Sequence, residues 1–198
     1  MKNRIKIDKI TMQHPLDVYE LMQLILKREH KVDRNKEYFW VLSLSQENKI
    51  LSLELVALGA NNRVSASAAD VLAVPLQKEA KGVILIHNHP SGSLEPSERD
   101  KDYTNKMIQV CRIMNTPMLD YVIITEHNYF SFAKSGLLEE LEASLKYVPP
   151  YEIEAMFYND GREEEKSEIA RNMLSRGLDM QLICEMTGLS EAEIGALK

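Results

Sequence analysis

The 198-residue sequence predicts an α/β fold, in which helices sandwich a mixed sheet and a small helical unit follows. Two observations favour this class. Dense β-type runs alternate with stretches of helical spacing, and the run at 82–87 is continuously apolar, as in strands buried on both faces. Hydrophobic residues make up 44% of the chain and charged residues 27%, which is typical of a globular protein with a sizeable core.

The predicted elements follow the order β-β-α-β-α-β-β-α after a first helix. The predicted strands are residues 38–45, 50–58, 82–87, 118–125 and 129–132, and the predicted helices are residues 16–27, 68–80, 97–114 and 135–146. Ser67 is expected to cap the second helix. Pro75 falls inside that helix and is expected to kink or shorten it.

Three segments are expected. Residues 1–146 form the α/β domain. Residues 147–165 contain Pro-Pro, Asn-Asp-Gly and an acidic run, which predict a linker. Residues 166–198 are helical, and Gly177 and Gly188 are expected to end the first two helices of this tail.

The tail has the form of a helix-turn-helix at Thr187-Gly-Leu-Ser. Its third predicted helix is capped by Ser190, with Glu193 at the capping-box spacing, and is therefore acidic at the end that would meet a DNA groove. Between Asp160 and Lys198 there are nine acidic residues and five basic ones. Contact with phosphates normally needs the reverse balance. We therefore expect the tail to bind protein or to self-associate.

The most informative stretch is HNHPSGSLEPSERD, residues 87–100. His87 and His89 end a predicted strand, and their side chains share one face if the extended geometry persists. Alone, the pair could be ordinary loop residues. The Pro-Ser-Gly that follows turns the chain, so Asp100 in the next helix can face the strand end. Two imidazoles and one carboxylate leave a position open for water, as in catalytic zinc sites, so we expect one Zn²⁺ per chain.

A catalytic site of this kind needs a general base that is not a ligand, and Glu54 is our candidate. Glu54 interrupts an apolar strand, where a buried carboxylate is costly unless it has a partner such as a metal-bound water. The alternative is a carboxylate that faces solvent from an edge strand. Ser97, three residues before Asp100, is expected to cap the helix or to donate a hydrogen bond to a developing oxyanion.

Together these residues resemble the JAMM motif of JAB/MPN domains, which has a glutamate, His-x-His and a later aspartate with a serine three residues before it. HNHPSG followed by Pro-Ser and Asp, with ELVALG at 54–59 and FWVLSL at 39–44, is more narrowly similar to the RadC branch. The resemblance covers roughly residues 15–140. It implies a cytidine-deaminase-like fold and metallopeptidase activity, often on isopeptide bonds. It also carries an old DNA-repair label.

By this resemblance, zinc would be bound by His87, His89 and Asp100. Glu54 would activate water, and Ser97 would assist at the oxyanion. The first function that we expect is therefore a zinc-dependent hydrolase of a protein or peptide substrate. Hydrolysis of a non-peptide amide would use the same residues.

The second function that we expect belongs to another class, namely an accessory protein of a DNA-repair or mobile-element system with a non-catalytic metal site. Such a protein would bind nucleic acid or partner proteins. The net charge of −6 argues against a broad nucleic-acid face. The N-terminal sequence lacks a signal-peptide core, no stretch could span a membrane, and the two cysteines lack CxxC spacing. We therefore expect a cytoplasmic location and no membrane partner.

Overall fold

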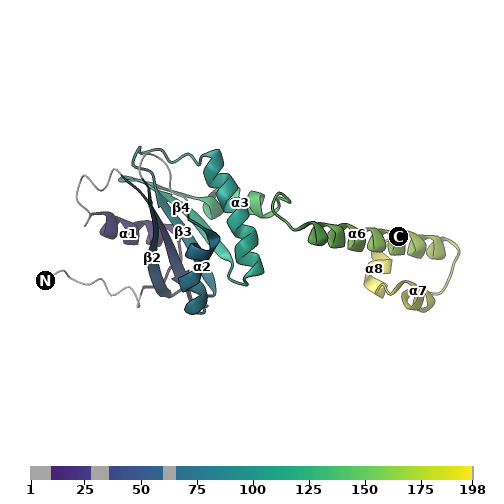
Figure 1. The fold of residues 1–198 in the computed structure, drawn as a ribbon. Helices are drawn as coiled ribbons and strands as arrows, with labels where there is room; N and C mark the ends of the chain where they lie inside the picture. Colours follow the sequence, from purple (N-terminus) through teal and green to yellow (C-terminus); the bar gives the residue numbers. More distant parts are fainter. Residues whose placement is uncertain (1–9, 28–35, 60–65, 198) are drawn as a thin grey trace. The chain divides into compact units, whose positions relative to one another are not determined.

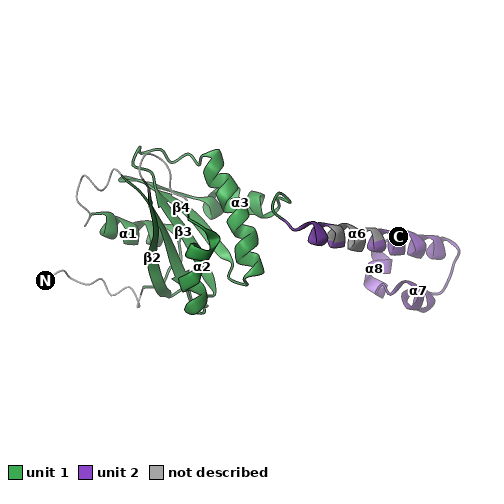
Figure 2. Cartoon of the chain, in the orientation of Figure 1, with its two compact units in different colours: residues 1–147 green, residues 148–198 purple. Residues whose placement is uncertain are grey.

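The structure is a computed structural model that describes residues 10–27, 36–59 and 66–197 (Figure 1). The chain divides into two compact units, residues 1–147 and residues 148–198, which are coloured separately in Figure 2. Unit 1 contains the sheet, and the part of unit 2 that the structure describes is helical. Among the described residues, no helix has the length and apolar character needed to cross a membrane.

Unit 1 is built on a five-stranded mixed sheet with the strand order β2-β1-β3-β4-β5. The strands are β1 (Glu37–Leu44), β2 (Ile50–Gly59), β3 (Gly82–Asn88), β4 (Met118–Ile124) and β5 (Tyr129–Ser131). β1 pairs with β2 and β3 in antiparallel fashion, β3 and β4 are parallel, and β5 returns antiparallel to β4. The central strand β3 and its neighbour β4 therefore end at the same edge of the sheet.

Helices cover both faces of this sheet (Figure 1). The helices of unit 1 are α1 (Pro15–Leu26), α2 (Ala68–Gln77), α3 (Glu98–Ile113), α4 (Phe132–Ser135) and α5 (Leu137–Glu142). Alternate strand residues point to opposite faces. On one face, Met22 of α1 packs in a core with Trp40. On the other face, Val71 of α2 and Met107 of α3 pack in a core with Leu85.

Most of the predicted elements of unit 1 lie within a few residues of their predicted positions. Ser67 caps α2, and Pro75 lies inside this helix, which ends three residues before the predicted end at Ala80. The helix predicted over 135–146 is shorter in the structure, where α5 covers Leu137–Glu142 and Ser135 is the last residue of the separate helix α4. Gly136 separates α4 from α5 with φ of +82°, a left-handed conformation that glycine adopts at little cost.

The expected linker over 147–165 is also corrected. In unit 2, α6 (Pro150–Ser175) runs through most of that segment, and α7 (Met180–Thr187) and α8 (Glu191–Ala196) follow it. A proline in the first turn of a helix lacks only an N–H that has no intrahelical acceptor anyway. The proline pair at 149–150 therefore starts a helix here.

The three helices of unit 2 pack around a small core of Ala170, Ile183 and Ile194. The predicted helix ends are confirmed, since Gly177 follows α6 and Gly188 follows α7, both with positive φ. The predicted capping box at the start of α8 is confirmed as well.

Candidate metal centre

His87 and His89 lie together where β3 ends. His87 pairs with Phe39 of β1 and with Ile123 of β4, so strands hold it on both sides. The backbone N–H of His89 donates to the carbonyl of Ile124 at 2.9 Å, which extends the pairing with β4 beyond the strand. The two imidazole rings meet edge to face with their centroids 4.6 Å apart. As predicted, both imidazoles face the same space.

The loop after His89 fixes the protonation of that ring. Gly92 has φ of +82° and donates its N–H to the carbonyl of His89 at 3.1 Å, which closes a tight turn. The carbonyl oxygen of Ser93 then lies 2.9 Å from Nδ1 of His89. Because a carbonyl oxygen only accepts hydrogen bonds, Nδ1 must carry the ring proton. Nε2 of His89 therefore keeps its lone pair for a metal.

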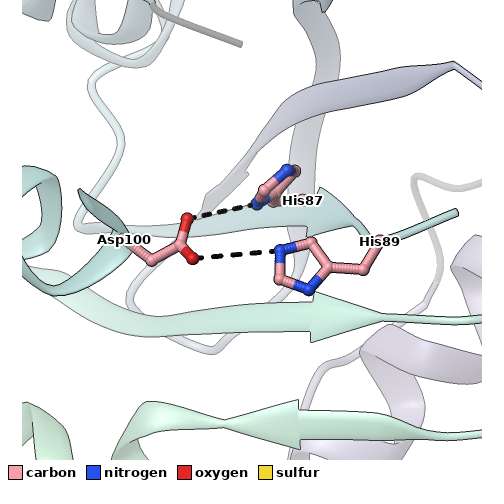
Figure 3. Close-up of side chains that lie close together, drawn as sticks. All are labelled: His87, His89 and Asp100. Carbon is pink, nitrogen blue, oxygen red and sulfur yellow. Dashed lines mark ion pairs between the residues drawn. The ribbon is translucent and has the colours of Figure 1, made fainter. Parts of the chain in front are cut away.

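Asp100, in the first turn of α3, directs its two carboxylate oxygens at the two imidazoles (Figure 3). Oδ1 lies 3.5 Å from Nδ1 of His87, and Oδ2 lies 3.8 Å from Nε2 of His89. Ser97 holds the carboxylate in place, since its hydroxyl donates to Oδ2 at 2.6 Å and its backbone N–H at 2.8 Å. Ser97 is thus the helix cap that we predicted, and its hydroxyl proton is used by Asp100.

The electrostatics of the cluster favour the protonation states that a metal needs. Burial alone raises the pKa of Asp100, but hydrogen bonds from His87 and Ser97 outweigh it and lower that pKa to about 2. Burial, followed by the nearby charge of His87, lowers the pKa of His89. At neutral pH, Asp100 is therefore ionised and His89 is neutral, and these are the forms that bind metals.

His87, His89 and Asp100 could together bind a metal ion. Each offers one ligand atom, and these three atoms lie within 4.8 Å of one another. Nε2 of His87 is buried and has no hydrogen-bond partner within the described part of the chain. A buried nitrogen left in this state is costly, and a cation would satisfy it. Two imidazoles and one carboxylate suit zinc with an open coordination position.

The carboxylate beside this cluster is that of Glu37, the first residue of β1. Its side chain is buried, and its Oε2 lies 3.8 Å from Nε2 of His87. Glu37 also lines a cavity of about 960 Å³ together with His87, His89, Ser97 and Asp100. An ionised group in such a place is costly unless a cation or a proton compensates for it. Glu37 therefore occupies the place that we expected for the general base.

Our placement of Glu54 at the cluster is corrected. Glu54 lies on the edge strand β2, opposite Val41, and does not line the cavity. β1 lies between β2 and the histidine strand. In addition, Val41 is two residues away from Phe39, the residue of β1 that pairs with His87. Both the strand order and the register therefore keep Glu54 away from the histidines.

Sequence reasoning also missed the residue between the two histidines. Asn88 is buried, and its side chain bonds to the backbone on both sides of Glu37. Its Oδ1 accepts from the N–H of Tyr38 at 2.6 Å, and its Nδ2 donates to the carbonyl of Lys36 at 2.9 Å. Asn88 thereby fixes Glu37 relative to His87. The signal in the sequence was an amide between two candidate ligands.

Tyr121 of β4 is a second residue that the sequence did not single out. Its hydroxyl lies 3.2 Å from Nδ1 of His87, and it lines the same cavity. Burial first, and then the Asp100 carboxylate, raise the pKa of Tyr121 well above its ordinary value. The hydroxyl therefore keeps its proton.

A neighbouring carboxylate, Asp102, is bound elsewhere. The hydroxyl of Tyr147 donates to both of its carboxylate oxygens, at 2.8 and 2.9 Å, and Lys146 forms an ion pair with it. Asp102 lines the cavity but is not part of the histidine cluster.

Two family models match this chain. A family model described as a RadC-like JAB domain matches residues 12–137. A second model, described as the C-terminal HTH domain of the Rpn/YhgA-like nuclease family, matches residues 163–198. The first model covers more than half of the chain, including every residue of the histidine cluster.

Curated relatives match the same region. A UPF0758 protein of Aquifex aeolicus is 32% identical over 130 residues, which are 66% of this chain and 54% of that protein. A UPF0758 protein of Pelodictyon phaeoclathratiforme is 38% identical over 54% of this chain and 48% of its own length. A UPF0758 protein of Flavobacterium johnsoniae is 36% identical over 67% of this chain and 55% of its own length. The chain thus spans about half the length of the curated relatives it matches. By the match over residues 12–137, this chain belongs to the RadC-like JAB domain family.

Proposed function

We propose that this protein is a zinc-dependent hydrolase that cleaves peptide or isopeptide bonds. One observation carries the proposal. His87, His89 and Asp100 converge at the wall of a cavity, and the buried carboxylate of Glu37 lies beside them without being part of the three-residue cluster. A structural metal site has no need of such a base, whereas amide hydrolysis requires one.

Each residue has a role in this proposal. His87, His89 and Asp100 would hold the ion, which when bound supplies an activated water and polarises the scissile carbonyl. Glu37 would accept a proton from water and deliver it to the leaving nitrogen. Ser97 orients Asp100, and a rotation of its hydroxyl would let it donate to the oxyanion, as we predicted from the sequence.

The space around the cluster suits an extended polymer. The large cavity and a second one of about 400 Å³ share His89 and Ser91 in their walls. A chain that crosses these two residues would therefore have room on both sides. This arrangement supports a protein or peptide as the substrate rather than a small amide.

The first experiment is the metal content of the purified full chain, measured by elemental mass spectrometry. We expect about one zinc per chain in the wild type and none in Asp100→Ala, because the site would lose its only carboxylate ligand. Asp102→Ala is the matched control and should keep its zinc, since Asp102 is bound to Tyr147 and Lys146 instead. A wild type without metal, even after zinc is supplied, would overturn the proposal.

A second candidate function concerns unit 2, because residues 163–198 match an HTH domain. The third helix of the unit, α8, is six residues long and has Glu191 and Glu193 in its first turn. This charge opposes contact with phosphates. We therefore propose that unit 2 binds protein or self-associates. Salt-dependent binding of the full chain to duplex DNA would contradict this proposal.

A further inference from the structure

We infer that Tyr121 is a positioning residue of the metal site, whose hydroxyl fixes the orientation and the tautomer of His87. The inference rests on the proposed metal site and deepens it. The starting observation is the 3.2 Å distance between the hydroxyl oxygen of Tyr121 and Nδ1 of His87, both of which are buried.

The position of the Tyr121 hydroxyl is set by packing. The Tyr121 ring lies nearly parallel to the His87 ring, with an angle of 23° and a centroid distance of 6.4 Å. Phe39 and Phe132 pack against it, with ring centroids 6.2 and 4.9 Å away. Tyr121 is 2% exposed, and its β4 backbone is paired with β3. The hydroxyl therefore has little freedom to leave His87.

A tyrosine hydroxyl can accept one hydrogen bond while it donates another. In the arrangement that we infer, Nδ1–H of His87 is shared between the Tyr121 oxygen, 3.2 Å away, and the more distant Oδ1 of Asp100, 3.5 Å away. The hydroxyl proton of Tyr121 is then directed to the Asp100 carboxylate. The arrangement leaves Nε2 of His87 bare, and Nε2 is the buried atom that has no partner among the described residues.

The two histidines are then held in the same way by different acceptors. For His89, the acceptor at Nδ1 is the carbonyl of Ser93. For His87, it is the Tyr121 hydroxyl. Partners of this kind orient metal-binding histidines and raise their basicity, and their loss typically weakens metal binding by about 10- to 100-fold.

Tyr103 provides a matched control. It also lines the cavity and packs against Phe39, but its hydroxyl donates to the carbonyl of Ala66 at 3.1 Å. A change from Tyr to Phe removes one hydroxyl at either position. Only the change at Tyr121 removes a contact with a candidate ligand.

The test is the zinc affinity of the full chain, measured by competition with a chromophoric chelator at constant pH. We expect Tyr121→Phe to bind zinc about 10- to 100-fold more weakly than the wild type, and Tyr103→Phe to bind it as the wild type does. Equal affinities for Tyr121→Phe and the wild type would overturn the inference. A wild type that takes up no zinc would instead overturn the proposed function. The inference about Tyr121 would then be tested by the second measurement, which needs no metal.

The second measurement is the tautomer of His87 in the metal-free wild type, read from the ring ¹⁵N shifts by NMR. Packing around the ring does not determine which nitrogen of His87 carries the proton, whereas a hydrogen bond to the Tyr121 hydroxyl does. We expect the proton on Nδ1 in the wild type and a mixture of tautomers in Tyr121→Phe. A wild-type ring with its proton on Nε2 would overturn the inference, even if the Phe variant did not fold.

Discussion

Glu37 illustrates how much of the site depends on single buried side chains. Its carboxylate is taken out of water at the start of β1, next to an imidazole nitrogen with no hydrogen-bond partner among the described residues. Burial of a charged carboxylate opposes folding, and apolar packing does not offset this cost. A glutamate at this position is understandable if it acts on a substrate or on water at a metal.

This role leads to a prediction for a pair of variants. Glu37→Gln should keep the zinc of the wild type but lower turnover by roughly 10²- to 10⁴-fold, because the amide cannot accept the proton. Glu54→Gln, on the edge strand, should leave both unchanged. The measurement is turnover of a peptide that the zinc-loaded wild type cleaves, with zinc content measured beside it. If only Glu54→Gln loses turnover, our original assignment from the sequence is restored.

Asp120 gives a prediction at the same scale outside the site. Burial raises the pKa of Asp120, although hydrogen bonds from the N–H of Ala133 and the hydroxyl of Ser131 partly offset this. The folded state therefore binds the Asp120 proton more tightly than the unfolded state. Stability from this group is present below the ordinary pKa of 3.8 and is lost as pH rises through the raised value.

Asp120→Asn keeps the shape of the side chain and removes its charge. We expect the variant to be more stable than the wild type at neutral pH, and this difference to shrink towards zero as pH falls to about 4. The measurement is urea unfolding of the metal-free chain over this pH range, followed by fluorescence of Trp40, the single tryptophan. A difference that is constant with pH would show that Asp120 does not titrate in this way.

Sequence reasoning found the three residues of the candidate metal cluster but not the candidate base, Glu37. His87, His89 and Asp100 are close in sequence, so their spacing and one turn were enough to bring them together. Glu37 and Glu54 are both on strands, and the choice between them depends on strand order and on a register with a bulge after Phe39. Such pairing is a property of the folded sheet, and no local pattern reveals it.

At the scale of elements, the Asn88 side chain continues the pairing of β1 with β3. The last backbone pair of these strands joins Phe39 and His87, and the Asn88 amide then bonds to the two residues that flank Glu37. An amide side chain can do this because, like a peptide group, it both donates and accepts. The edge of the sheet that carries the site is thereby held in register.

We predict that Asn88→Ala destabilises unit 1 by about 2 to 4 kcal/mol, since it leaves the buried N–H of Tyr38 and the carbonyl of Lys36 without this partner. Urea unfolding followed by Trp40 fluorescence would measure the change. Asn128→Ala is the control, because the side-chain oxygen of Asn128 accepts from the adjacent, exposed N–H of Tyr129. A cost at Asn88 no larger than at Asn128 would show that the amide does not hold the strands.

Helix starts were predictable because capping is local. Ser67, Ser97 and Ser190 each accept a hydrogen bond from an N–H three residues later. Two predictions from the sequence differ from the structure for the opposite reason. The helix predicted over 135–146 begins only after Gly136 and ends at Glu142, and α6 continues through the predicted linker, whose composition favours turns. In both places the surrounding structure outweighs local propensity.

At the scale of the whole molecule, the two units have separate cores. All residues of the two cores on the sheet belong to unit 1, and the core of Ala170, Ile183 and Ile194 belongs to unit 2. Every candidate site residue, and Tyr147 at the cavity wall, also lies in unit 1.

We therefore predict that residues 1–147 alone fold and bind zinc as the full chain does. The measurement is the zinc content of this fragment and its thermal unfolding, followed by Trp40 fluorescence. The full chain is the control. A fragment that aggregates or takes up no zinc would show that unit 2 is needed for the fold of unit 1.

The location of the ligands on two different elements has one more consequence. His87 belongs to the central strand and His89 follows it directly, while Asp100 belongs to α3, so an ion bound by all three would tie helix to sheet. Such a tie favours the folded state by mass action, by about 4 kcal/mol when free zinc is a thousandfold above its dissociation constant. The melting temperature of the protein would then rise with the zinc concentration around it. As zinc became scarce in a cell, the protein would lose stability and become more susceptible to proteolysis while most of its sites still held zinc.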